Sequence, residues 1–91
     1  PHTKPADMLA LGRALRSLSA QGVLVIGSGS LTHNLQRFFG SPSPVDAPEE
    51  QDCAAFRAWV DSRTSAADWP ALLDYRAQAP YAREMHPTDE H

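Results

Sequence analysis

The stretch VLVIGSGSLTHN, residues 23–34, decides how the fold of this chain is interpreted. Four apolar residues, Val23 to Ile26, lead into a turn of glycines and serines and then into a predicted helix whose first residues include His33. A run that is apolar throughout is typical of a strand buried on both faces of a parallel sheet. Ligands of α/β proteins commonly bind just beyond the carboxyl end of such a strand. The stretch therefore predicts an α/β fold with a candidate functional residue at His33.

Helices are predicted on both sides of this strand. Apolar residues at intervals of three and four predict a helix over residues 5–20, with Gly22 placed to end it. A second helix is predicted after the turn, with Ser30 as its N-cap and Gly40 as its C-terminal stop. The order indicates a layered α/β fold in which helices flank a central, mostly parallel sheet, with one strand and several helices in this chain.

The second half of the chain is predicted to be loop and helix. Three prolines within residues 41–48 predict an exposed loop. A third helix is predicted over residues 49–63, and Asp68 is placed to begin a short fourth one. Pro80 should interrupt that helix, and Pro87 favours an extended His86 in a loop or at a helix end. The residues predicted to form the buried face of the third helix are Cys53, Phe56, Trp59 and Val60.

A single strand cannot pair its own backbone groups, so its partner strands are expected outside this sequence. We therefore expect residues 1–91 to be part of one incomplete domain, lacking an N-terminal half and a C-terminal end. Eight basic and eleven acidic residues give a net charge of −3 without a basic cluster, which argues against nucleic acid. No long apolar run or signal peptide is evident, so we expect no membrane partner and a cytoplasmic location. The single Cys53 excludes an internal disulfide.

Three familiar motifs of βα turns fit this turn poorly. Gly27 and Gly29 follow the strand as in a dinucleotide-binding turn, but Thr32 stands where the third glycine is required. Neither Ser28 nor Ser30 has the flanking glycines of a nucleophile elbow, and the P-loop lysine is absent. A nucleotide-binding protein or a serine hydrolase is therefore not indicated.

Two histidine-containing segments are the remaining candidates for chemistry. A helix N-terminus disfavours imidazolium, so a neutral His33 could act as a base or a ligand; the alternative is that it only caps or packs at the turn. His86 and His91 flank Asp89 and Glu90, a set of side chains acceptable to iron or zinc. The alternative is a group of solvated polar residues at a chain end.

The combination of these motifs resembles a known family. LGRAL at residues 11–15, GVLVIGSGSLTHNL at 22–35, LLDY at 72–75 and HPTDEH at 86–91 are similar to the C-terminal half of DOPA-type extradiol aromatic ring-opening dioxygenases. These belong to the class III, protocatechuate-dioxygenase-beta-like superfamily. The resemblance covers most of the chain. It implies an incomplete catalytic domain of a non-haem Fe(II) enzyme, with Zn(II) as an alternative metal, that cleaves a catechol-type ring with insertion of dioxygen.

The resemblance also implies roles for individual residues. By match to the GSGSxxHN block, His33 would be the catalytic residue that hydrogen-bonds substrate or oxygen and moves protons, and Ser30, Thr32 and Asn34 are substrate-binding candidates. By match to the HPTxEH block, His86 would be a metal ligand.

Glu90 is the alternative ligand, and two further ligand histidines of the family cannot be assigned in this chain. A small catechol-type substrate and dioxygen are the implied partners of a monomer or homodimer. The alternative function is that of a catalytically inactive homologue acting as a binding or structural subunit.

Overall fold

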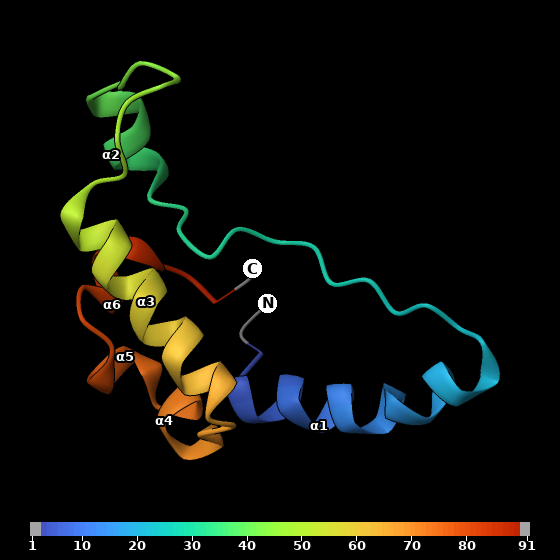
Figure 1. Cartoon of the computed structure of the whole chain (residues 1–91). Helices are drawn as coiled ribbons and strands as arrows, with labels where there is room; N and C mark the ends of the chain where they lie inside the picture. The colour runs from blue at the N-terminus through green and yellow to red at the C-terminus, as the bar shows by residue number, and fades with distance from the viewer. Residues whose placement is uncertain (1–2, 90–91) are drawn as a thin grey trace. The chain divides into compact units, whose positions relative to one another are not determined.

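The computed structural model describes residues 3–89, and these are predominantly helical (Figure 1). The described residues form two units, one of residues 3–30 with Asp89 and one of residues 31–88, and each is considered by itself. The elements in chain order are α1 (Pro5–Leu15), the 3-10 helix η1 (Arg16–Gln21), α2 (Leu35–Gly40), α3 (Gln51–Ser65), α4 (Trp69–Leu73), α5 (Tyr75–Gln78) and α6 (Ala82–Met85).

The expected α/β fold with a central parallel sheet is wrong, because no strand occurs among residues 3–89. Residues 23–30 instead form a segment without regular secondary structure. The side chains of Leu24 and Ile26 are 80% and 78% exposed. A β-strand exists only through hydrogen bonds to a neighbouring strand, and the described residues provide none. The apolar character of residues 23–26 was therefore not sufficient to predict a strand.

The first unit contains the helix predicted over residues 5–20, which is confirmed as α1 followed directly by η1. Pro5 occupies the first turn of α1, where its missing N–H costs no hydrogen bond. Gly22 ends the helical run with a φ of 76°, a left-handed conformation that glycine adopts without steric penalty. Met8 and Leu11 are each 48% exposed, so the apolar face of α1 is only partly covered.

The core of the second unit forms around the central helix α3. Phe56 is 1% exposed and packs against Ala79, Ala82 and Met85, so α3 is joined to α6 and the preceding turn. The predicted burial of Phe56 is confirmed, whereas the other three residues predicted for this face are only partly buried. Partly buried residues around this cluster are Cys53, Trp59, Val60 and Tyr75.

The boundaries of the shorter helices follow from their caps. The prediction that Ser30 caps the second helix is wrong: α2 begins at Leu35, and Asn34 Oδ1 accepts a hydrogen bond from the Arg37 amide at 2.9 Å. The predicted start at Asp68 is confirmed, because its Oδ1 accepts from the amide of Ala71 at 3.3 Å.

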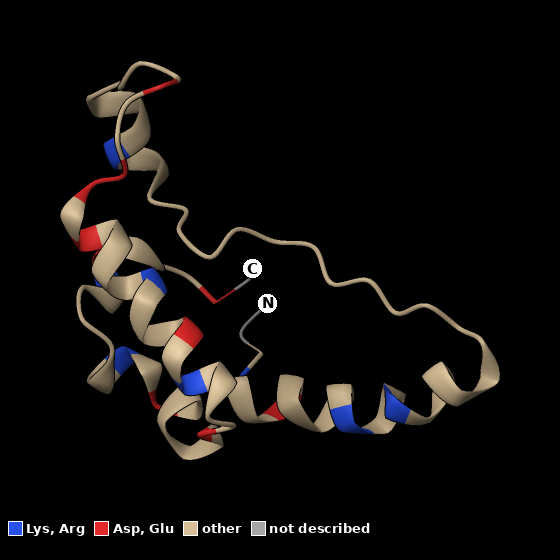
Figure 2. Cartoon of the chain, viewed as in Figure 1, with Lys and Arg blue, Asp and Glu red and all other residues tan. Residues whose placement is uncertain are grey.

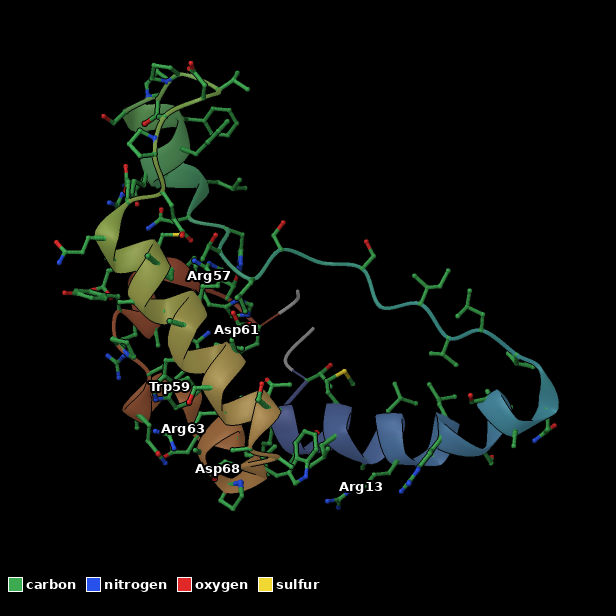
Figure 3. All side chains as sticks on the ribbon, in the orientation of Figure 1. Arg13, Arg57, Trp59, Asp61, Arg63 and Asp68 are labelled. Atoms are coloured by element: carbon green, nitrogen blue, oxygen red, sulfur yellow. The ribbon has the colours of Figure 1, made fainter. Side chains whose placement is uncertain are left out.

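Charges of both signs are distributed along α3 (Figure 2). At its C-terminal end, Arg63 lies over the Trp59 ring at 5.8 Å and forms an ion pair with Asp68 at 3.3 Å (Figure 3). These contacts connect α3 to the cap of α4. Among the residues that the structure describes, no helix has the length and apolar character needed to cross a membrane.

Candidate functional site

Two segments distant in sequence are joined by hydrogen bonds at the candidate site. The His33 amide donates to the carbonyl of Met85 at 2.9 Å. The next residue, Asn34, donates from Nδ2 to the carbonyl of Glu84 at 2.8 Å. The loop before α2 is therefore fixed to the C-terminal turn of α6, which places both predicted histidines in one region of the second unit.

His86 is the C-cap of α6, and its side chain is buried, with 9% of the residue exposed. Its Nδ1 lies 3.0 Å from the carbonyl oxygen of Leu31. A carbonyl oxygen only accepts hydrogen bonds, so Nδ1 carries the proton, and in the neutral ring Nε2 carries the lone pair. A backbone partner on one ring nitrogen is the usual arrangement for a histidine that binds a metal through the other.

His33 lies directly beside this ring. The centroids of the two imidazoles are 4.4 Å apart with an interplanar angle of 90°, an edge-to-face contact. His33 Nε2 is also 3.2 Å from the hydroxyl oxygen of Thr88. The half-buried His33 ring is thus contacted by two residues of one short segment.

Helix α5 packs against α6 and contributes two further residues to this region. The Tyr75 ring meets the His86 ring nearly perpendicularly, at a centroid separation of 5.6 Å. The Arg76 guanidinium lies 5.4 Å from the Tyr75 ring centroid and donates to the carbonyl of Pro87 at 3.2 Å. Sequence reasoning assigned no role to Tyr75, Arg76 or Thr88, although Tyr75 and Thr88 fall inside the quoted motifs.

The remaining predicted site residues are the three substrate-binding candidates and the alternative metal ligand Glu90. Ser30 is exposed and belongs to the first unit. Thr32 is half-buried, with its hydroxyl 3.8 Å from Cys53 Sγ. The Asn34 amide participates in the two hydrogen bonds described above. Glu90 lies outside the described residues. The substrate-binding and ligand roles of these residues stay predictions.

The described residues fit part of a metal site. No group of three or more His, Cys, Asp or Glu side chains suited to holding a metal ion occurs among residues 3–89. His86 nevertheless offers an oriented imidazole, a ligand that suits iron and zinc. These residues are therefore compatible with one ligand of a site but not with a complete set.

Two carboxylates near the start of α3 have lowered pKa values. A hydrogen-bonded ion pair with Arg57 lowers the pKa of Glu49, and a hydrogen bond from Arg37 lowers that of Asp52. Both side chains are therefore ionised at neutral pH and engaged by arginines. They are poor candidates for a general acid.

Two curated relatives are dioxygenases by name. The chain is 36% identical over 81 residues to "4,5-DOPA dioxygenase extradiol" of Beta vulgaris, a match that covers 89% of this chain and 29% of the relative. It is 32% identical over 90 residues to "Dioxygenase tasH" of Hapsidospora irregularis. That match covers 91% of this chain and 28% of the relative. No family model matches the chain, and no solved structure matches it.

These matches show that the chain is similar to dioxygenases. More particularly, they confirm its resemblance to the DOPA-type extradiol dioxygenases, which the sequence motifs predicted. The chain spans less than a third of the length of these relatives.

Proposed function

We propose that this chain contributes to a metal-dependent, non-haem extradiol dioxygenase that opens a catechol-type ring and inserts both atoms of dioxygen. The observation that carries the proposal is the edge-to-face contact of the His33 and His86 rings, whose centroids are 4.4 Å apart. The His86 ring is also held by its hydrogen bond to Leu31, a residue 55 positions earlier in the chain. The names of two relatives support the same class of reaction.

His86 is proposed as a metal ligand through Nε2, because the Leu31 carbonyl engages Nδ1 and orients the ring. Fe(II), or Zn(II) in the same site, is the proposed metal, and Glu90 is the alternative ligand from this chain. A bound ferrous ion would supply open positions at which the catechol oxygens and dioxygen are brought together.

His33 is proposed as the acid–base residue. A neutral imidazole accepts a proton from a catechol hydroxyl and can return it to an oxygen atom later in the reaction. Its amide is fixed to α6 through Met85, so the ring is presented from a defined backbone position. Ser30, Thr32 and Asn34 are proposed contacts for the substrate.

The test compares His33→Ala and His86→Ala in the intact protein, with Gln36→Ala, an exposed change on α2, as the control. Oxygen uptake is measured over a panel of catechols after loading with Fe(II), and metal content is measured separately. We expect His33→Ala to lower turnover by about 100-fold or more while retaining metal. His86→Ala should lose metal.

Isotopically labelled dioxygen provides a second measurement, because both labelled atoms should appear in the ring-opened product. The opposite pattern, with metal loss in His33→Ala and retained metal in His86→Ala, would contradict the assigned roles. A wild-type protein that binds the metal but consumes no oxygen with any catechol would refute the enzymatic proposal and favour the inactive homologue.

A further inference from the structure

The hydroxyl group of Thr88 lies beside the His33 ring. Its oxygen is 3.2 Å from His33 Nε2, within hydrogen-bonding distance. Thr88 follows His86 by two positions, and the His86 ring contacts the His33 ring edge to face. One short segment therefore contacts the imidazole twice, once at its ring and once at a nitrogen atom.

The backbone of His33 is fixed independently of these two contacts. Its amide donates to Met85, and the following residue is bonded to Glu84. The remaining freedom of His33 lies in its side-chain torsions. The outer torsion of histidine is broad and roughly two-fold, so packing alone permits two ring orientations related by a half-turn.

A half-turn of the His33 ring exchanges the positions of Nε2 and Cε1. The Thr88 hydroxyl would then face a carbon atom, and the hydrogen bond at 3.2 Å would be lost. The edge-to-face contact with His86 constrains the plane of the ring but distinguishes these two orientations less strongly. The hydrogen bond to the hydroxyl favours the orientation that the structure shows.

We propose that Thr88 is a positioning residue that holds the His33 imidazole in a single orientation, and so determines which ring atom faces the reacting oxygen of the substrate. The inference rests on the proposed acid–base role of His33. The segment that carries Thr88 has other attachments: the Pro87 carbonyl accepts from Arg76, and the His86 ring donates to Leu31. Removing the hydroxyl should therefore leave the backbone in place.

The first experiment uses Thr88→Val, which keeps the branched shape but removes the hydroxyl, and Thr88→Ser, which retains it. Thr64→Val, an exposed change on α3, is the matched control. In the intact Fe(II)-loaded protein we expect Thr88→Val to lower kcat by about fivefold, the effect of one neutral hydrogen bond, with KM within about twofold of wild type. Thr88→Ser should restore most of kcat, and Thr64→Val should match wild type.

The second experiment records nitrogen-15 NMR signals of the His33 ring in the diamagnetic Zn(II)-loaded protein. We expect one set of ring signals in wild type and Thr88→Ser, and a shifted Nε2 signal or two sets in Thr88→Val. This measurement does not require turnover, so it still tests Thr88 if wild type consumes no oxygen and the proposed function fails. Unchanged His33 ring signals in Thr88→Val, or a serine variant that behaves like the valine variant, would overturn the proposal.

Discussion

Truncation of Phe56 to alanine should be the most damaging single core substitution in the second unit. Phe56 is 1% exposed and is surrounded by Ala79, Ala82 and Met85. A buried phenylalanine removes on the order of 150 Å² of mostly apolar surface from water, which corresponds to about 4 kcal/mol. Phenylalanine-to-alanine changes in protein cores cost about 3–5 kcal/mol. Two of the neighbours are alanines, whose short side chains cannot fill the cavity, so we expect a loss of about 4 kcal/mol.

The assay is urea-induced unfolding of the intact protein, followed by circular dichroism. The control is Phe39→Ala, because Phe39 lies on α2 and is 76% exposed. We expect the control to change the free energy of unfolding by less than about 0.5 kcal/mol. A similar change in the two variants, or a loss below about 1.5 kcal/mol for Phe56→Ala, would refute the assignment of Phe56 to the centre of the core.

The milder variant Phe56→Leu connects this core to the site. Met85 belongs to the Phe56 cluster, and its carbonyl also accepts the hydrogen bond from the His33 amide. A looser core should therefore increase opening of α6 and accelerate hydrogen exchange of the His33 amide. Unchanged exchange at that amide in a measurably destabilised Phe56→Leu protein would show that core and site are not coupled.

Three further predictions concern caps and charges. Asn34→Asp keeps the oxygen that caps α2 but removes the amide donor to Glu84, so it should lower the free energy of unfolding by about 1 kcal/mol. Asn34→Ala removes both hydrogen bonds and should lower it by about 2 kcal/mol. Equal losses in thermal unfolding would contradict the double role of Asn34 as helix cap and as donor to Glu84. Asp68→Ala should lower the free energy of unfolding by about 1 kcal/mol, because it removes the cap of α4. Asp68→Asn keeps a capping oxygen and should lower it by less than half as much. Thermal unfolding measures both, and equal losses would contradict the capping role. The pKa values of Glu49 and Asp52 are lowered in the folded state. On acidification these two groups therefore take up protons in the unfolded chain first. The free energy of unfolding should fall as the pH drops below about 5 and continue to fall through the folded-state pKa values of the two groups. The double variant Glu49→Gln, Asp52→Asn should flatten this part of the urea midpoint–pH curve, and an unaltered slope would exclude these two groups as its source.

Helices and helix starts that are determined by residues close together in the sequence could be predicted from the sequence. The helix α3, its buried Phe56 face and the start of α4 at Asp68 each arise from side chains a few positions apart. The apolar residues 23–26 are different, because a strand depends on a partner that local sequence does not specify. The sequence therefore predicted the long helices and failed at the segment whose hydrogen bonds would have to be non-local.

The start of α2 shows how a distant contact decides between two acceptable local signals. Ser30 and Asn34 are both good N-cap residues, so local preference alone did not separate them. Asn34 has the additional hydrogen bond to Glu84, 50 positions away, and this bond anchors the loop before the helix. A residue that caps a helix and binds a second element at once has an advantage that sequence reasoning could not assess.

The sequence singled out His33 and His86, which the structure brings into contact, but not the residues around them. The motifs identified His33 and His86 by type and position, whereas the roles of Tyr75 and Thr88 depend on how α5 and the segment after α6 fold around those rings. That folding requires a sharp reversal between α5 and α6.

The reversal occurs at Tyr81, whose φ of 55° is uncommon for a residue that is not glycine. Pro80 predicted an interruption at this place but not its direction. The left-handed conformation at Tyr81 costs about 1–2 kcal/mol, which the burial of Ala82 and Met85 in the Phe56 cluster offsets. The core thus stabilises the turn that brings α6, and with it His86, back beside Tyr75 on α5.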